Sequence, residues 1–517
     1  MPRGTLQTII NPSPGGTRED LSPALIPEGW LLSSRNWLTR RGRGKPRPGY
    51  DSTLTVTDAL RIIGIGFRGT HQQASNIVFF TRAHQYSWDG TSLTNATSSG
   101  WVASTDNQLV RSITFTQGGT DYLLATNTSN ALLEWTGSGA FTATGGSPPA
   151  ARDLVAVGNR ILLMGIQGTS FPYRVQWSGF KDRTSWTSTG FTELRETSGY
   201  VVGGANFGPN TAAVYKDDSI YLATVQAAVE PFQFQYVAMV PGPLSPAAIV
   251  NVLGVHYWMG EDFSIYQFDG AEPKLVSSGL VNTVQQNISY ADRDQTFGFP
   301  QVTQDFREVW FFYPNRSETF NGISCNIITG AVNHHVFADA ITAGAEWRMG
   351  GRTIDGLDAF SSTIDGLDSV SSTINGLDGT APIEQLGLLG TNAGEALIFG
   401  SAYTDDDGTA IPWAFEHPWT APGKDQARVQ VDAVDTLWYG AAGPGITITA
   451  GVAVTDKLTD SETFTTTTFN NSTDEQHLLT FPNMRGKLVK IAHSGNAVSA
   501  NLEFRGAVLT SWPRGRV

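Results

Sequence analysis

Residues 308–330 read EVWFFYPNRSETFNGISCNIITG, an apolar run followed by a short polar turn and a second apolar run. This pattern predicts two β-strands joined by a turn. The same pattern occurs five more times upstream, at residues 76–90, 121–137, 159–179, 211–224 and 254–270. The chain is therefore expected to contain a series of antiparallel hairpins.

These hairpins recur with a loose period. The centres of their first strands are 39 to 53 residues apart, close to the period of about 40 to 50 residues that four-stranded propeller blades show. A further hairpin at 385–400 follows after 78 residues, a gap that becomes 48 once an insertion of 30 residues is removed. Four-stranded sheets packed radially bury each other's faces. The sequence therefore predicts a mainly β fold with a six- or seven-bladed β-propeller over residues 56–400, and unrelated hairpins in β-sandwiches are the alternative.

The composition agrees with short strands and tight turns. Of 517 residues, 16% are charged and 40% hydrophobic, with 56 Gly and 25 Pro. A chain of this length predicts two or three domains. Beyond residue 413, alternating segments such as GITITAGVAV (445–454) and NLEFRGAVLTSW (501–512) predict a C-terminal, platform-like β-sandwich over residues 401–517. Residues 1–55 are expected to form an N-terminal arm.

Features of secreted or membrane-spanning chains are missing from the sequence. The single cysteine, Cys325, cannot form an internal disulfide or a cysteine-based zinc cluster. The opening residues MPRGTLQTIINPSPGG lack the apolar core of a signal peptide. The uncharged stretch 237–260 contains three prolines, so it is not expected to cross a bilayer. We expect folding in a reducing cytoplasm and no membrane span.

The net charge of −13 is unevenly distributed. Residues 1–50 hold eight Lys/Arg and three acids, whereas residues 353–408 hold ten carboxylates and no basic residue. Outside the first segment the chain is therefore expected to repel DNA phosphates. The basic stretch TRRGRGKPRPGY (39–50) binds either nucleic acid or an acidic protein surface, and its Gly and Pro residues without an aromatic platform favour protein contact. The candidate contacts to another subunit or an adaptor are Arg40, Arg41, Arg43 and Arg47.

Residues 353–379 contain three repeats, TIDGLDAFSS, TIDGLDSVSS and TINGLDG. Their Asp-Gly and Asn-Gly steps predict turns, and their Ile and Leu residues are the regular apolar positions. We predict an ordered insertion at 351–380 that lies against a neighbouring chain or faces a channel. Calcium binding is the alternative, but the spacing fits neither the EF-hand nor the nonapeptide repeat. The candidate residues are Ile354, Asp355, Asp358, Ile364, Asp365, Asp368, Ile374 and Asp378.

Motifs for catalysis and cofactor binding are weak or missing in the sequence. GIGFRG (64–69) matches a dinucleotide-binding loop, but a second strand pattern follows it, which favours strand-turn glycines. TDDDGT (404–409) offers three carboxylates to a cation, although a hairpin tip is favoured. We expect no enzyme activity, catalytic residue, cofactor or metal. The alternative is a carbohydrate-binding or carbohydrate-cleaving β-propeller.

Several segments resemble one protein family. LSPALIPEGWLLSSRNWLTRRGRGKPRPGY (21–50) resembles the opening of the tail nozzle, or tail hub, proteins of short-tailed bacteriophages. Residues 174–188, 242–270 and 415–432 and the TIDGLD repeats are similar to later landmarks of the same family. These positions are structural and include no catalytic motif.

The resemblance implies a β-propeller protein with a platform domain, located in the virion tail after assembly in the host cytoplasm. Six copies would form a ring beneath an adaptor protein, near tail fibres or spikes, that retains packaged DNA and conducts it during ejection. An acidic lumen would repel phosphate, so double-stranded DNA would pass without specific binding. We therefore expect a non-enzymatic homohexamer of the virion tail.

Overall fold

The computed structural model describes residues 6–11, 15–23, 25–40, 43–69, 77–90, 92–101, 108–166, 171–186, 190–227, 230–302, 307–317, 320–348, 385–400, 402–422, 428–439, 447–457, 464–470, 475–480, 482–496 and 502–513. Within these ranges the fold is mainly β. The helical segments there are short: η1 (Pro246–Ala248), α1 (Val281–Asn287) and η2 (Tyr290–Gln295). No helix of the described part is long and apolar enough to cross a membrane.

Six four-stranded antiparallel sheets follow one another along the chain, and in each sheet every strand pairs with the next. The first three consist of β6 (Ile62–Phe67), β7 (Ile77–Thr81), β8 (Gln85–Trp88) and β9 (Leu93–Asn95); β10 (Arg111–Gln117), β11 (Thr120–Thr126), β12 (Leu133–Trp135) and β13 (Thr142–Ala143); and β14 (Ala151–Val157), β15 (Arg160–Ile166), β16 (Phe171–Trp177) and β17 (Phe191–Glu193). The next three consist of β18 (Val201–Gly208), β19 (Thr211–Lys216), β20 (Ser219–Val225) and β21 (Phe232–Met239); β22 (Ile249–Val252), β23 (Val255–Met259), β24 (Ile265–Phe268) and β25 (Lys274–Ser277); and β26 (Phe297–Val302), β27 (Arg307–Pro314), β28 (Phe320–Asn326) and β29 (Val332–Val336).

A seventh sheet combines distant parts of the sequence. Its strands, in order, are β30 (Ile341–Arg348), β31 (Gln385–Thr391), β32 (Glu395–Gly400), β5 (Gly49–Thr55), β33 (Asp405–Asp406) and β34 (Thr409–Ala410). The N-terminal strand β5 pairs antiparallel with β32. Burial of the Tyr50 side chain, which is 0% exposed, favours this position for the strand.

The seven sheets form a closed ring. The first strand of each sheet contacts the first strand of the next, from β6 through β10, β14, β18, β22 and β26 to β30, and β30 contacts β6 again. The first and seventh sheets share one apolar core, in which Ile77 and Phe79 pack with Trp347 and Leu388. The fold is a multi-bladed β-propeller, so the propeller predicted from the hairpin period is confirmed.

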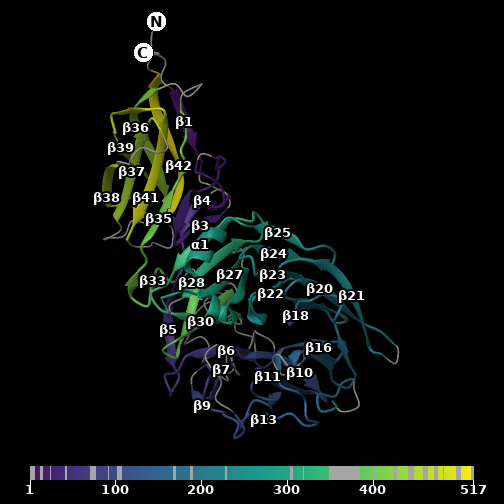
Figure 1. The fold of residues 1–517 in the computed structure, drawn as a ribbon. Helices are drawn as coiled ribbons and strands as arrows, with labels where there is room; N and C mark the ends of the chain where they lie inside the picture. The colour runs from purple at the N-terminus through teal and green to yellow at the C-terminus, as the bar shows by residue number, and fades with distance from the viewer. Residues whose placement is uncertain are drawn as a thin grey trace, which may run out of the picture.

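Two further sheets stand beside the propeller (Figure 1). One contains β3 (Trp37–Arg40), β4 (Arg43–Pro46), β42 (Glu503–Pro513), β36 (Val429–Tyr439), β39 (Glu475–Thr480), β1 (Leu6–Ile10) and β40 (Met484–Gly486), and the other β2 (Ser33–Arg35), β35 (Trp413–Glu416), β41 (Leu488–Gly495), β37 (Thr447–Thr455) and β38 (Phe464–Asn470). They share a core in which the Trp37 ring lies 4.3 Å from Phe415 and 5.0 Å from Trp413, measured between ring centroids. We call them the C-terminal sheets.

The N-terminal segment does not form a separate arm within the described residues. β1 and β4 pair with β42, β3 pairs with β4, and β2 pairs with β35, so the segment supplies strands to both C-terminal sheets. β5 then continues into the propeller. The predicted boundary at residue 55 is therefore wrong. N-terminal strands pair with edge strands of the C-terminal sheets, and these edges would otherwise be open to pairing with another chain.

Candidate functional site

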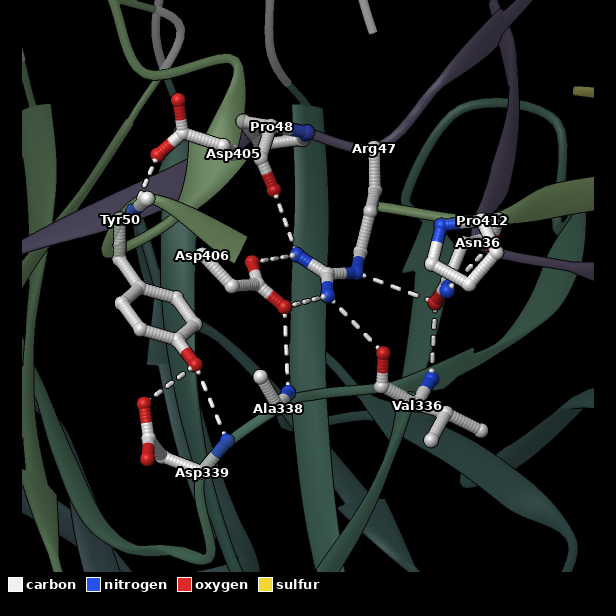
Figure 2. Close-up of polar contacts among 11 residues, drawn as sticks. Asn36, Arg47, Pro48, Tyr50, Val336, Ala338, Asp339, Asp405, Asp406 and Pro412 are labelled. Carbon is white, nitrogen blue, oxygen red and sulfur yellow. Dashed lines mark hydrogen bonds and ion pairs between the residues drawn. The ribbon is translucent and has the colours of Figure 1, made fainter. Parts of the chain in front are cut away.

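The chain crosses from the C-terminal sheets to the propeller between β4 and β5, and Arg47 lies at this crossing. Its side chain is 0% exposed. Figure 2 shows the guanidinium between Asp406, Asn36 and the backbone of Val336, the last residue of β29. Residues from three distant parts of the chain therefore meet at one arginine.

All five N–H groups of the Arg47 guanidinium have acceptors. Nη1 and Nη2 donate to the two carboxylate oxygens of Asp406 at 2.8 and 2.5 Å. The remaining bonds go to Asn36 Oδ1 at 3.1 Å, to the Pro48 carbonyl at 2.9 Å and to the Val336 carbonyl at 2.9 Å. The guanidinium also lies 4.0 Å from the centroid of the Phe337 ring. A buried arginine is tolerated when its guanidinium pairs with a carboxylate through two parallel hydrogen bonds and all its other N–H groups also have acceptors.

Asp406 belongs to the TDDDGT stretch, which forms the β33–β34 hairpin. The turn residues Asp407 and Gly408 have φ of 48° and 82°, as a two-residue Asp-Gly turn requires. Asp406 also accepts a hydrogen bond from the Ala338 amide at 3.1 Å. The favoured interpretation was a solvated hairpin tip: the hairpin is confirmed, but Asp406 is not solvated, because its side chain is 4% exposed and its carboxylate is engaged by Arg47.

Tyr50 extends this network into the propeller. Its hydroxyl donates to Asp339 Oδ2 at 2.7 Å and accepts from the Asp339 amide at 3.1 Å. Burial, and then the negative charge of Asp406, raises the pKa of Tyr50. The hydroxyl therefore keeps its proton and its donor role at neutral pH.

Arg40 makes a second buried contact to the propeller. Nε and Nη2 donate to the two carboxylate oxygens of Glu308, on β27, at 2.9 and 3.2 Å. The two side chains are 9% and 2% exposed. The structure corrects the sequence prediction for Arg40 and Arg47. Both side chains form buried ion pairs within the chain, as a buried charge requires, and so neither is exposed for contact with another subunit or an adaptor.

Of the other predicted contact residues, Arg43 is exposed and Arg41 is not among the described residues. Arg43 is 55% exposed and pairs with Glu503 at 3.0 Å, between neighbouring strands of one C-terminal sheet. Arg41 and every candidate of the repeat insertion lie outside the described residues. The insertion itself lies between β30 and β31, whose end residues Arg348 and Gln385 pair directly.

The first strands of all seven sheets line an axial channel with a volume of about 460 Å³. Its charged lining residues are one base and one acid, Arg111 and Glu346. A cavity of this size is typical of small-molecule sites. It is far too small for duplex DNA, whose major groove alone is about 12 Å wide.

The structure brings together a pair of carboxyl groups that the sequence did not reveal. We call the face with the loops between second and third strands the upper face; Asp217 and Glu261 lie on two such loops. Gly242 links them, since its amide donates to the Asp217 carbonyl and its carbonyl accepts from the Glu261 amide, at 2.8 and 2.9 Å. Arg293 lies 3.3 Å from Glu261 Oε1, and burial raises the pKa of both carboxyl groups.

The fold also settles how the GIGFRG stretch is to be interpreted. Residues 64–69 lie in and just after β6, which leads to β7 of the same sheet, so the interpretation of GIGFRG as strand-turn glycines is confirmed. Across the described ranges, no group of three or more His, Cys, Asp or Glu side chains is arranged to hold a metal ion.

No protein-family model and no curated protein sequence matches this chain. The extracellular domain of a proposed one component system from B. thetaiotaomicron has a similar structure, with 10% identity, a TM-score of 0.40, and coverage of 68% of this chain and 40% of that one. AofleA from Arthrobotrys oligospora (12% identity, 48% and 77% coverage, TM-score 0.28) and the SapL1 lectin in complex with alpha methyl fucoside (10%, 47% and 90%, 0.28) are also similar. The present chain thus spans 40% of the length of the first of these proteins. Similarities this weak carry no argument about function.

Proposed function

We propose that this protein is a structural component of a bacteriophage tail and forms the distal nozzle ring that retains packaged DNA and conducts it during ejection. One observation carries the proposal: the segment that resembles nozzle proteins, residues 21–50, supplies β2, β3 and β4 and the Arg47 junction. The resembling residues thus occupy the positions that join two structural parts, as expected for an architectural protein.

In this proposal the propeller has seven blades and the two C-terminal sheets form a β-sandwich platform. The cyclic contacts of the seven first strands support the blade number, and the shared core around Trp37 and Trp438 supports the sandwich. Because the axial channel of one chain cannot hold a duplex, the conduit is the lumen of a ring of six copies. Heterologous contacts that close on themselves generate such rings.

The net charge of −13 supports a DNA conduit over a DNA-binding protein. Acidic walls repel phosphate, so the polymer slides without being held. The proposed partners are further copies of the chain, a tail adaptor, and tail fibres or spikes. Arg41 and Arg43 remain candidates for the contact to a neighbouring subunit or the adaptor.

Imaging of purified virions by negative stain, with native mass measurement of the isolated protein, tests the proposal. We expect a six-fold ring at the distal tip of the tail that antibodies against this chain label. The free protein can remain monomeric until an adaptor templates the ring. Virions whose tails carry no such ring, or no copy of this chain, would refute the proposal.

A pair of variants tests the assembly role of the exposed arginines. Arg41→Ser with Arg43→Ser should leave the fold intact, because Arg43 is 55% exposed, but should reduce incorporation into tails. Arg195→Ser, at a propeller arginine whose side chain is 66% exposed, is the matched control and should assemble normally. Normal assembly of the double variant with a loss of DNA binding would favour a nucleic-acid contact instead.

The repeat insertion is proposed to be an ordered excursion that contacts a neighbouring chain. Since Arg348 and Gln385 pair directly, an Asn-Gly turn can replace residues 353–379 without changing the register of β30 and β31. We expect the shortened chain to fold as a monomer but to form rings poorly or to lower particle infectivity. Unfolding of the shortened chain would show that the insertion belongs to the propeller core.

A second candidate function is a carbohydrate-cleaving propeller, which the carboxyl pair Asp217 and Glu261 favours. Glycoside hydrolysis uses a pair of Asp or Glu side chains, at least one of which has a raised pKa, and burial raises the pKa of both carboxyl groups here. Incubation with host-surface polysaccharide, followed by analysis of reducing ends, tests this function. Product formed by the unmodified protein but not by Glu261→Gln or Asp217→Asn would support the enzyme over the nozzle.

A further inference from the structure

A cavity of about 240 Å³ lies beside the axial channel, and Arg111 lines both. Arg111 is the first residue of β10 and pairs with Thr126, the last residue of β11. The loop between these second and third strands belongs to the upper face, so Arg111 lies at the upper end of the channel. We call the cavity of 240 Å³ the mouth cavity. Its other polar lining side chains are Gln108, Thr128, Arg152 and Asp294.

The Arg111 guanidinium is held from behind by a buried carboxylate. Its Nε donates to Asp153 Oδ1 at 3.1 Å, and Asp153 is 0% exposed. The Gly204 amide donates to Asp153 Oδ2 at 2.9 Å. Gly203 leaves room for this oxygen, because a Cβ at Gly203 would lie 2.5 Å from it. Three neighbouring sheets, through β10, β14 and β18, therefore fix the position of one arginine.

The same guanidinium keeps donors for a ligand. Arg40 and Arg47, which join parts of the fold, each donate to both oxygens of their carboxylates. Arg111 donates to Asp153 through Nε, and within the described ranges its Nη1 and Nη2 have no acceptor. Its side chain is 31% exposed. The two Nη atoms form a fork that matches the two oxygens of a carboxylate.

The charges around the mouth cavity suit a ligand with one negative charge. Its charged lining side chains are Arg111, Arg152 and Asp294, and Arg152 pairs with Asp294. Asp153 contacts the Nε side of Arg111, so a ligand anion at the Nη fork meets the cation before it meets this carboxylate. Carboxylates on the neighbouring upper-face loops, among them Asp217, add negative potential. This potential opposes a dianion more strongly than a monoanion.

We propose that the mouth cavity binds a small monocarboxylate, such as a sugar acid, whose carboxylate accepts hydrogen bonds from Nη1 and Nη2 of Arg111. The Gln108 amide and the Thr128 hydroxyl then bind hydroxyl groups of the ligand, and Pro246 and Ala247 form an apolar wall. The volume lies just below the range of about 300 to 1,000 Å³ for drug-sized ligands, which limits the ligand to a smaller molecule. This inference does not depend on the proposed function.

Calorimetric titration of the full chain with D-glucuronate tests the proposal. D-glucose is the matched probe, because it has the same ring and a hydroxymethyl group in place of the carboxylate. Sodium chloride keeps the ionic strength equal in all titrations, since salt screens charge interactions. We expect saturable binding of glucuronate, weaker binding of inorganic phosphate and no binding of glucose. Absence of glucuronate binding, or equal binding of glucose, would overturn the proposal, and tighter binding of phosphate would overturn it in favour of a phosphate site.

Arg111→Lys distinguishes a ligand-binding arginine from a structural one. Lysine keeps a cation beside Asp153, so the variant should fold, but it lacks the fork, so the affinity for glucuronate should fall about tenfold. Arg174→Lys is the matched control, because Arg174 pairs with Glu193 at 2.9 Å in the third sheet and does not line the mouth cavity. Its affinity should stay unchanged. Unchanged affinity of Arg111→Lys, or an equal loss in both variants, would overturn the proposal.

Gln108→Leu keeps the test valid if Arg111→Lys does not fold. This change leaves the ion pair between Arg111 and Asp153 in place and removes one donor from the cavity wall. The affinity for glucuronate should fall about fivefold, as for the loss of one neutral hydrogen bond. Unchanged affinity in this variant would overturn the proposed arrangement of the ligand.

Discussion

Replacing Arg47 is expected to destabilise the protein more than any substitution at an exposed arginine. Arg47→Met leaves the buried Asp406 carboxylate with the Ala338 amide as its remaining bond shown by the structure, and it leaves the Pro48 and Val336 carbonyls without their arginine donor. Removing one partner of a buried ion pair costs about 3 to 5 kcal/mol. The free energy of unfolding should therefore fall by about 4 kcal/mol.

A double-mutant cycle separates the pair from the rest of the network. Asp406→Leu alone should cost a similar amount, because it leaves the Arg47 charge buried without its carboxylate. The double variant should cost less than the two single losses together, by about 2 kcal/mol or more, since both charges are then removed. Urea unfolding followed by tryptophan fluorescence and by far-ultraviolet circular dichroism measures these free energies.

These free energies are defined only for a single cooperative transition, so fluorescence and circular dichroism should give coincident unfolding curves in every variant of the cycle. Arg43→Met is the control, because this side chain is 55% exposed and its ion pair should contribute less than about 1 kcal/mol. A loss below about 1 kcal/mol for Arg47→Met, or additive effects in the cycle, would refute the structural role assigned to Arg47.

Three further predictions concern stability. Burial lowers the pKa of His256 and His417 to about 4, so below pH 6.5 the folded protein binds fewer protons than the unfolded chain. The free energy of unfolding should therefore fall by about 3 kcal/mol per histidine between pH 6.5 and pH 4. A free energy of unfolding that stays constant over this pH range would contradict the prediction. Gly49→Ala should destabilise by more than about 2 kcal/mol in urea, because a Cβ there would lie 1.8 Å from the Asp405 carbonyl oxygen, whereas Gly208→Ala, with no atom within 4 Å, should not. Burial raises the pKa of Cys325 to about 12, so its thiol should resist alkylation until the protein unfolds, and rapid labelling of the native chain would disprove this.

The hairpins were predictable because their determinants are local. In EVWFFYPNRSETFNGISCNIITG the apolar runs and the polar turn are adjacent, and the structure has β27 and β28 there. The pairing of β5 with β32 was not predictable in the same way. It joins residues more than 300 positions apart, and only the three-dimensional closure of the ring brings the two strands together.

The contact between Arg47 and Asp406 was only partly predictable from the sequence. Arg47 and Asp406 were both singled out, the first within a basic segment and the second within TDDDGT, but as separate candidates. They are 359 residues apart. The excess of basic residues in 1–50 and of carboxylates in 353–408 was the signal that could have joined them, because oppositely charged segments of one chain attract. Charge counts do not report burial, so the intrachain pairing could not be separated from a contact to another chain.

The burial of Arg40 and Arg47 separates folding from assembly. A ring of copies needs two different complementary surfaces on each chain, and side chains locked into ion pairs with Glu308 and Asp406 cannot belong to them. The N-terminal segment therefore belongs to the fold of the single chain, and a contact between copies would have to use residues that stay exposed, such as Arg43. If the nozzle proposal holds, variants at Arg47 should fail before any ring can form, whereas variants at Arg43 should fold and fail only when copies or an adaptor are required.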